Sequence, residues 1–593
     1  MKEKYSVWMR IAFVFIGAIA VWLLNTKIVV AADGDQAVLA QLRNANQDKL
    51  ASELKFVATT EQAVMYTFVG LENEIVLDDV LQRLAKMQSK GTFFIMERDL
   101  RLYPKRVEKI IAQQQEIGIA IRPRPEAEFD EVAEEILRVQ KQLHDQYQIE
   151  TKLVKQPWGT IGDSVKEAVS ALGCSLIGQT VNVVQGKHKD MEAAEDIMTQ
   201  IFGKSVASLG RGQIVHFRLD FYRRNHLIGE LMELIKVRKL DNIAYRTWDD
   251  NPTENSENDS AYWIKSVGEV LENQAFLYAY PIDRMAVPER LRNTHRSFAI
   301  NEENFRFESA KRYIGAPTVS TADRMLGFTN QEMRRLDQSG LIRTDDPVVF
   351  FTFDDWGHDA SVNPLLYVLR KHRIPATFFI ITNRVLTNPN LLRSIAREGH
   401  DIGSHSDLHK PMVLRDAATG NLLPGQDGEE YFADLSTAYQ KLESVVGDVE
   451  VNGKYALTRY FRPPTLAISK MGLLTNFAIG NEYVISGSYS TGDYAVESVE
   501  AMVRELQKGI YTKRGVQKGA VLVMHMTESA AYTARALDLL LTANALRSDA
   551  DPFKFKVGRL SDYVTEGYSQ ADTKVKHNLI EVGRKDAQDK TGN

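Results

Sequence analysis

Short apolar runs alternate along this chain with longer segments of helical spacing. Val64–Val69 is a short apolar run, Leu77–Met87 has apolar residues at helical spacing, and Thr92–Met96 is again short and apolar. Short runs are typical of buried strands, whereas apolar residues three and four positions apart are typical of helices. Their alternation predicts an α/β unit with a largely parallel sheet.

The same order of elements recurs in the second half of the chain. Four pairs of segments share a spacing of 285 positions (352 − 67 for the first pair): Thr67-Phe68 with Thr352-Phe353, Thr92–Ile95 with Thr377–Ile380, Pro104 with Pro389, and Ile117-Gly118 with Ile402-Gly403. A constant spacing without an insertion predicts an internal duplication rather than two unrelated α/β segments.

The length of 593 residues exceeds what one hydrophobic core usually serves, so we expect two domains. The predicted division is a signal peptide or membrane anchor at 1–32, a stalk or helical lead-in at 33–60, a first α/β domain at 61–250, an interdomain segment at 251–345, a second α/β domain at 346–570 and a polar tail at 571–593.

The N-terminus has the pattern of an export segment. Basic residues precede the apolar run Ile11–Leu24, which is short for a spanning helix of ~20 residues, and Val30–Ala32 has the small residues of a cleavage site. Taking Ile11–Ala32 as one span instead gives a membrane anchor, with Lys27 near the outer interface. Both alternatives predict that the bulk of the protein is exported.

The net charge and the cysteine count exclude some functions. A net charge of −5 provides no basic surface for nucleic acid, so we expect no nucleic-acid partner. Cys174 is the single cysteine, which excludes an intrachain disulfide and a metal cage of thiolates.

Carboxylates and imidazoles follow two strand-like runs of the second half. Asp354 and Asp355 end the run that begins at Val349, and His405 and His409 follow a later run. Two neutral imidazoles and one carboxylate leave an open coordination position, as a catalytic metal requires. One aspartate would be a ligand and its neighbour a base. We expect one divalent ion, with Zn²⁺ as the default and Co²⁺, Ni²⁺ or Mn²⁺ as alternatives.

The first half lacks these side chains at the corresponding positions. At the spacing of 285, the counterparts of the two aspartates and two histidines are Val69, Gly70, Ala120 and Arg124. Gly519–His525 aligns with Gly212–Arg218, so arginine replaces the final histidine. We therefore expect a degenerate, noncatalytic first domain that supports the second or holds glycan. Trp158 would either line a sugar-binding groove or be buried.

Four motifs in the second half resemble those of a known protein family. They are TFDD at Thr352–Asp355, HSDLH at His405–His409, FRPPT at Phe461–Thr465 and VLVMH at Val521–His525. Together they make residues 346 to about 565 resemble the polysaccharide deacetylase family, also called the NodB homology domain or carbohydrate esterase family 4. The resemblance implies two tandem distorted (β/α) barrels, the first degenerate, behind the N-terminal segment.

The resemblance also implies individual roles. Asp354 would be the general base, oriented by Arg462, and His525 would be the general acid. The metal ligands would be Asp355, His405 and His409.

Three positions depart from the family pattern. Trp356 replaces the usual glycine and could narrow the groove or stack on a sugar. Thr465 replaces an aromatic residue, although its backbone N–H could still serve an oxyanion. A further family motif, typically a D-x-x-D-W arrangement, survives only as Ser490–Tyr494, so the carboxylate that supports His525 is either Asp493 or absent.

The resemblance implies a metal-dependent N-deacetylase that hydrolyses acetamide groups of an acetylated cell-wall or exopolysaccharide polymer, and the N-terminal segment predicts that this enzyme is exported. The alternative is a noncatalytic surface protein that binds or assembles glycan with a drifted deacetylase site. The intact aspartates and histidines favour the enzyme, whereas Thr465 and Ser490 favour the alternative.

Overall fold

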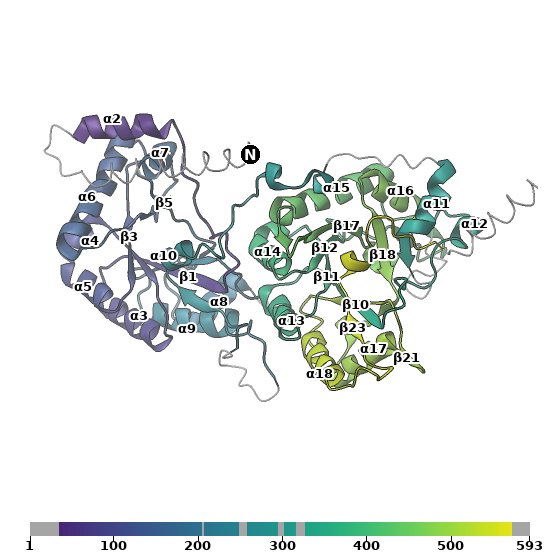
Figure 1. Cartoon of the computed structure of the whole chain (residues 1–593). Coiled ribbons are helices and arrows are strands. Elements are labelled where there is room, and N and C mark those ends of the chain that lie inside the picture. Colours follow the sequence, from purple (N-terminus) through teal and green to yellow (C-terminus); the bar gives the residue numbers. More distant parts are fainter. Residues whose placement is uncertain (1–34, 204–206, 248–257, 294–301, 316–325, 572–593) are drawn as a thin grey trace, which may run out of the picture.

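The structure is a computed structural model that describes residues 35–203, 207–247, 258–293, 302–315 and 326–571. Two α/β units lie side by side, each with a parallel sheet surrounded by helices (Figure 1). The predicted signal or anchor segment at 1–32 and all but the first residue of the polar tail lie outside the described residues. No helix within the described ranges has both the length and the apolar character that crossing a membrane requires.

The first sheet is centred on β1 (Ala63–Val69), which is buried along its whole length. A strand covered on both faces needs a continuous apolar run, which β1 has. The order is β5-β4-β3-β2-β1-β7-β6, and β8 also pairs with β1. The other strands are β2 (Thr92–Ile95), β3 (Glu116–Ala120), β4 (Leu153–Lys155), β5 (Ser175–Leu176), β6 (Val181–Asn182), β7 (Ile214–Arg218) and β8 (Trp263–Lys265). The helices are α2 (Asp35–Asn46), α3 (Glu74–Lys86), α4 (Glu97–Leu102), α5 (Pro104–Ala112), α6 (Phe129–Tyr147), α7 (Asp163–Ala171), α8 (Ala194–Phe202), α9 (Leu227–Lys239) and α10 (Val267–Glu272).

The second sheet is centred on β10 (Val348–Asp355), which is buried except at its last residue. The order is β19-β22-β10-β11-β12-β17-β18-β9, and β23 also pairs with β10. The other strands are β9 (Tyr313–Gly315), β11 (Thr377–Ile380), β12 (Asp401–Ser404), β17 (Leu457–Phe461), β18 (Tyr483–Gly487), β19 (Tyr489–Ser490), β22 (Ala520–His525) and β23 (Lys556–Val557). The main helices are α11 (Glu302–Arg312), α13 (Asp359–Lys371), α14 (Pro389–Arg397), α15 (Gly428–Val446), α16 (Lys470–Ala478), α17 (Val499–Ile510) and α18 (Thr533–Ala545).

Neighbouring strands are parallel throughout both sheets. Among the described residues, the strands at the two ends of each path do not pair with one another, so each sheet is an incomplete barrel. The predicted α/β fold with two tandem distorted barrels is confirmed.

The two sheets have the same internal register. Matching pairings are Thr67 with Thr92 and Thr92 with Glu116 in the first sheet, and Thr352 with Thr377 and Thr377 with Asp401 in the second. Each second-sheet residue lies 285 positions after its counterpart, as 401 − 116 shows. Pro104 and Pro389 each begin a helix, where a missing N–H costs no hydrogen bond. Descent of the two units from a duplication stays a prediction, because register describes geometry and not origin.

Two segments predicted as connectors pack into these units. In the lead-in, Arg43 of α2 donates from Nε and Nη2 to the carboxylate of Glu167 at 2.8 and 3.2 Å, and Leu39 is buried. The segment 251–345 contributes β8 to the first sheet and β9 to the second. Strands of three residues are too short for a hydrophobic period, so the sequence did not reveal them.

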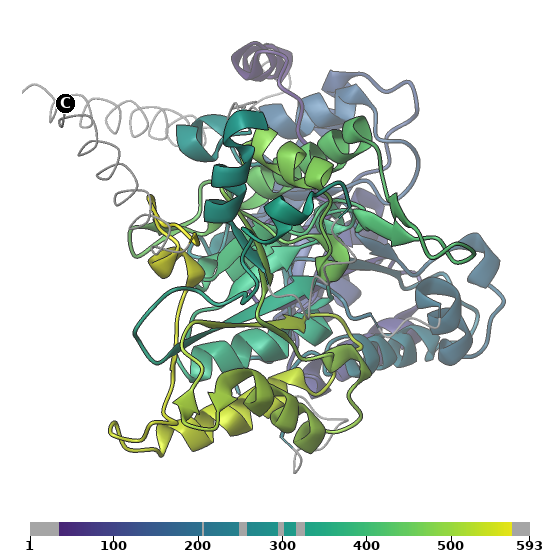
Figure 2. The same ribbon diagram turned by 90° about the vertical axis from the view of Figure 1, so that its right-hand side faces the viewer.

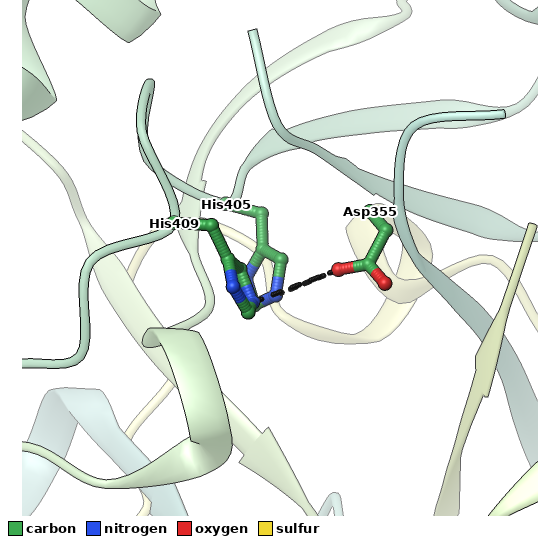
Figure 3. A group of neighbouring side chains, drawn as sticks. All are labelled: Asp355, His405 and His409. Carbon is green, nitrogen blue, oxygen red and sulfur yellow. Dashed lines mark ion pairs between the residues drawn. The ribbon is translucent and has the colours of Figure 1, made fainter. Parts of the chain in front are cut away.

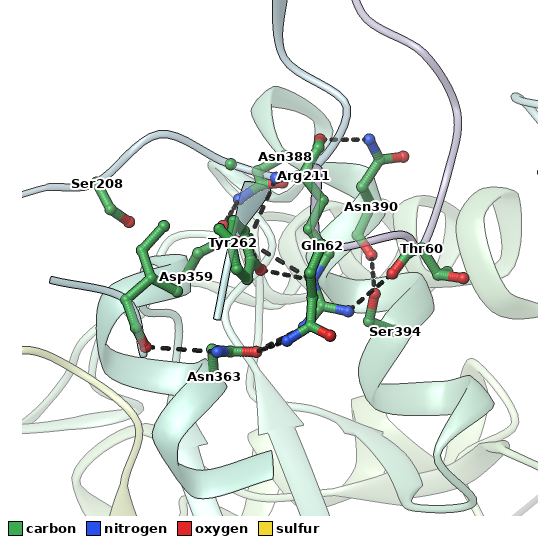
Figure 4. Close-up of polar contacts among 12 residues, drawn as sticks. Thr60, Gln62, Ser208, Arg211, Tyr262, Asp359, Asn363, Asn388, Asn390 and Ser394 are labelled. Carbon is green, nitrogen blue, oxygen red and sulfur yellow. Dashed lines mark hydrogen bonds and ion pairs between the residues drawn. The ribbon is translucent and has the colours of Figure 1, made fainter. Parts of the chain in front are cut away.

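A network of buried polar side chains joins the two units (Figure 4). Arg211, from the loop before β7, donates from Nε to the Tyr262 hydroxyl at 2.6 Å and from Nη2 to the Asn363 side-chain oxygen at 2.9 Å. The Tyr262 hydroxyl in turn donates to Asp359 at 2.5 Å. Because Asp359 begins α13, four residues after β10 ends, the network holds the first unit against the segment that carries the paired aspartates.

Helix α14 contributes an amide side chain to the same interface. The side-chain nitrogen of Asn390 donates to the backbone oxygens of Val57 and Arg211 at 2.9 and 2.6 Å, and its oxygen accepts from the Tyr278 hydroxyl at 2.7 Å. One short side chain thus satisfies backbone groups of the other unit that would otherwise be buried without partners.

We expect Arg211→Met to lower the free energy of unfolding by about 3–5 kcal/mol, because it removes one partner of a buried charged network and leaves Asp359 without its cation. Denaturant titration followed by circular dichroism measures the change. Arg238→Met is the matched control, because the Arg238–Glu195 pair is exposed and such pairs contribute about 0–1 kcal/mol. Equal losses in the two variants would contradict the prediction.

Candidate active site

The two adjacent aspartates reach one pocket because the chain turns at the end of β10. Asp354 is buried in the strand, whereas Asp355 has a positive φ of 79°. In a regular strand neighbouring side chains point to opposite faces, so this left-handed residue redirects the second carboxylate.

His405 and His409 lie in the loop after β12, and their rings approach Asp355 from the opposite side (Figure 3). Nε2 of each imidazole lies 3.6 Å from Oδ1 of Asp355, and the ring centres are 4.9 Å apart. Ser406 and His409 have positive φ values of 70° and 55°, so a left-handed loop, rather than a helix, brings the two rings together.

The loop is held by partners that sequence analysis did not identify. Asp434 of α15 accepts hydrogen bonds from the backbone N–H groups of Asp407 and Leu408 at 3.2 and 2.9 Å, and the Ser406 hydroxyl accepts from the His409 N–H at 2.9 Å. Asp434 is 27 positions beyond the first of these groups, and an acid on a helix gives no signal of such a role.

The donor set fits one divalent ion. Atoms bound at ~2.0–2.1 Å around a tetrahedral ion lie ~3.4 Å apart, close to the 3.6 Å that separates the carboxylate oxygen from each imidazole nitrogen. Nδ1 of His405 lies 2.8 Å from the backbone oxygen of Arg462, which can only accept, so Nδ1 carries the proton and Nε2 is free to coordinate. Burial, with the neighbouring His409, lowers the pKa of His405 to about 3, which keeps it neutral.

Asp354 is held by a buried arginine. Nη1 of Arg462 lies 2.5 Å from Oδ1 of Asp354 and 2.6 Å from the Thr352 hydroxyl, and Nε donates to the Ile485 backbone oxygen at 2.9 Å. Burial raises the pKa of the Asp354 carboxyl even though Arg462 acts to lower it. A raised pKa strengthens this carboxylate as a proton acceptor near neutral pH.

His525 lies at the end of β22, directly beside Asp354 in the sheet register. Its Nδ1 is 2.7 Å from Oδ1 of Asp493, whose second oxygen accepts from the His525 backbone N–H and the Thr533 hydroxyl, each at 2.9 Å. The structure thus supplies the carboxylate that sequence analysis left uncertain. Although burial acts to lower it, the Asp493 hydrogen bond and nearby carboxylates raise the pKa of His525 to about 9.

Residues 342–483 match the family model of polysaccharide deacetylases. The second half of this chain carries a polysaccharide deacetylase domain. The resemblance stated from four motifs is therefore confirmed for this half. The family model does not extend to residues 61–250, so the degenerate deacetylase-like domain there stays a prediction.

Similar curated proteins include a chitooligosaccharide deacetylase of Rhizobium leguminosarum bv. trifolii, 36% identical over 81 residues, which are 14% of this chain and 36% of that protein. Another is the peptidoglycan-N-acetylglucosamine deacetylase PgdA of Listeria monocytogenes, 30% identical over 201 residues, 33% of this chain and 35% of that protein. The chain thus spans little more than a third of the length of each of these two relatives.

One solved structure, of a carbohydrate esterase family 4 pseudoenzyme from Bacillus anthracis, is 22% identical and covers 38% of this chain and 67% of that chain at a TM-score of 0.29.

Two predicted substrate-binding residues of the deacetylase domain differ in their surroundings. Trp356 is half-buried and packs against the hydrophobic core. Thr465 is exposed and has a φ of 58°, an unfavourable conformation for a β-branched residue that is often found at functional sites. Sugar stacking by Trp356 and oxyanion binding by the Thr465 N–H stay predictions.

Sequence analysis gave no role to Tyr494. Its ring lies edge-on to that of His525, with centres 5.1 Å apart, and the residue is 57% exposed. An exposed aromatic ring beside the proposed acid is suited to contact a sugar.

Proposed function

We propose that this protein is an exported, metal-dependent polysaccharide N-deacetylase that hydrolyses acetamide groups of N-acetylglucosamine-type residues. The observation that carries the proposal is the convergence of three metal-ligand side chains with a base and an acid that each have a buried partner. Acetylated cell-wall or exopolysaccharide glycan is the proposed substrate. The N-terminal segment would export the protein, which is then either anchored facing outward or released.

Asp355, His405 and His409 would hold the ion, and zinc suits this mixture of nitrogen and oxygen donors. A divalent ion held by these residues would supply Lewis-acid chemistry to the reaction.

Asp354 would accept the proton of the attacking water, and Arg462 would hold its carboxylate in one orientation. His525, which the hydrogen bond to Asp493 would keep protonated, would donate a proton to the amide nitrogen, because that nitrogen leaves as a neutral amine. The Thr465 N–H would stabilise the negative charge on the carbonyl oxygen. The products are acetate and a glucosamine-type residue.

The contact between His525 and Asp493 also bears on the noncatalytic alternative. That alternative drew support from the shortened motif at Ser490–Tyr494, but Asp493 within it still supports the proposed acid. The remaining support is Thr465, whose proposed role needs only its backbone.

Acetate release from acetylated chitooligosaccharide and from peptidoglycan, with and without a chelator, tests the proposed function. We expect release that stops with the chelator and returns when zinc is restored. No release from either polymer by fully metallated protein would exclude the proposal and leave the glycan-binding alternative.

We expect Asp493→Asn to move the alkaline limb of the pH–rate profile to lower pH. The raised pKa keeps His525 protonated at neutral pH, and the acid form is lost as pH rises through about 9. A cation bound nearby would lower this pKa, so the alkaline limb would lie at or below that pH. Removing the Asp493 charge lowers the pKa, so activity fails earlier. Profiles of kcat against pH measure the shift, with exposed Asp345→Asn as control, and an unmoved limb would contradict the assigned support.

A further inference from the structure

A cavity of about 270 Å³ lies at the carboxyl edge of the first sheet. Its lining includes Gly70 after β1, Trp158 after β4 and Arg218 at the end of β7. Arg218 pairs with Val69 in the register at which His525 pairs with Asp354 in the second sheet. The cavity therefore occupies the place in the first unit that the candidate active site occupies in the second.

Different side chains fill the position of the metal ligand there. Gly70 has a φ of +85°, and a Cβ atom on it would lie 2.5 Å from Oδ1 of Asp220, so a side chain at this position would have to displace the Asp220 carboxylate. Arg218 donates from Nε and Nη2 to the two oxygens of Asp220 at 2.6 and 2.9 Å. An arginine–carboxylate pair thus replaces the residues that would hold an ion.

Two guanidinium groups pack on one indole in this cavity. The Cζ atoms of Arg218 and Arg122 lie 5.0 and 5.5 Å from the ring centre of Trp158. Contacts of this kind hold a guanidinium in place while its N–H donors remain available to a ligand. Trp158 thus lines the cavity and supports both guanidinium groups, of which Arg218 is already paired with Asp220.

The lining carries three arginines and three acids, and Arg122 is the arginine that has no ion-pair partner among these acids. Arg98 pairs with Glu72, and Arg218 pairs with Asp220. Arg122 is exposed, and within the described part of the chain no carboxylate lies at ion-pair distance from its guanidinium. The guanidinium of Arg122 is thus the lining cation that remains available to an anionic ligand.

Asp99 is the third acid of the lining, and its Oδ1 lies 3.8 Å from Nε of Arg98. It is 3% exposed, and one carboxylate oxygen accepts the Met96 backbone N–H at 3.2 Å. Burial raises the pKa of its carboxyl, which disfavours the charged form.

We propose that this cavity binds one carboxylate-bearing sugar residue of a glycan, with the carboxylate on Arg122 and the ring hydroxyls on the acids of the lining. A guanidinium matches a carboxylate with two parallel hydrogen bonds, and acidic side chains accept from hydroxyls. The volume lies below the roughly 300–1,000 Å³ of sites for drug-sized ligands, which suits a single sugar ring. The inference rests on the proposed function, because glycan chemistry in the second unit makes a sugar the source of the carboxylate.

Isothermal titration of the purified full chain tests this inference with four probes: glucuronic acid, N-acetylmuramic acid, N-acetylglucosamine and glucosamine. We expect at least one acidic sugar to bind tenfold or more tightly than the neutral and cationic sugars. Tighter binding of glucuronic acid would identify a uronic acid as the source of the carboxylate, whereas tighter binding of N-acetylmuramic acid would identify a lactyl ether. Absence of acidic-sugar binding, or equal affinity for N-acetylglucosamine, would overturn the proposal.

Arg122→Gln should weaken acidic-sugar binding at least tenfold without changing acetate release. Arg124→Gln is the matched control, because Arg124 is also exposed but pairs with Glu131. Unchanged binding in Arg122→Gln would assign the sugar to another site. Acetate release without acidic-sugar binding would contradict this inference alone, whereas acidic-sugar binding without acetate release would contradict the proposed function alone.

Discussion

His405→Ala is expected to remove the bound divalent ion and to reduce acetate release to background. The variant loses one of the three ligand atoms, Nε2 of His405, which lies 3.6 Å from the carboxylate oxygen of Asp355 in the unsubstituted protein. Loss of an outer-shell partner alone lowers metal affinity or activity by about 10–100-fold, so loss of a ligand should cost more. Elemental analysis after zinc loading and dialysis measures the ion, and acetate assay on the same sample measures activity.

The matched control for metal loss is His144→Ala, because His144 is an exposed histidine of the first unit. It should keep one ion per chain and full activity. Circular dichroism separates loss of the ion from loss of the fold. One zinc per chain in folded His405→Ala would show that the ion is held elsewhere, and the proposed metal centre would then be wrong.

Asp354→Asn should lower kcat by about 10²–10⁴-fold, which is the range for removing one positioned base. Asparagine has nearly the same shape and still accepts the hydrogen bond that Arg462 donates at 2.5 Å, but it cannot take a proton. Zinc content should stay at one per chain, because the predicted ligands are unchanged. Single-turnover acetate release and elemental analysis check the two expectations separately.

Asp345→Asn is the control for this substitution, since Asp345 is an exposed aspartate that precedes β10. We expect it to have wild-type kcat. Near-normal turnover in Asp354→Asn would remove the role of base from Asp354. Loss of zinc together with activity would instead place this aspartate among the ligands, which was the choice that the residues alone left open.

Most of the candidate site could be located from residue order alone. Asp354, Asp355, His405 and His409 follow apolar strands, and the carboxyl ends of parallel strands meet at one edge of a sheet. Motif spacing therefore predicted their proximity, which the structure confirms. The positive φ of Asp355 and the left-handed loop before His409 have no signature in these residue types, so the geometry of approach came from the structure.

The partners that tune the site could not be predicted in the same way. The resemblance left open whether Asp493 supports His525, which it contacts across 32 positions, and no sequence signal indicated that Asp434 fixes the histidine loop from a helix. Such contacts depend on how loops and helices pack over the sheet, and no local period records them. The resemblance proposed Arg462 as the partner of Asp354, but its full burial and its bonds to Thr352 and Ile485 required coordinates.

The sequence by itself determined the α/β class, the register shared by the two halves and the residues suited to a metal, because buried strands demand continuous apolar runs and chemistry demands particular side chains. Tertiary structure decided the division of residues 251–345 between both sheets, the polar network around Arg211 and the arginine-lined cavity beside Trp158. These features arise from groups distant in the chain, whose pairing depends on the packed arrangement of whole units.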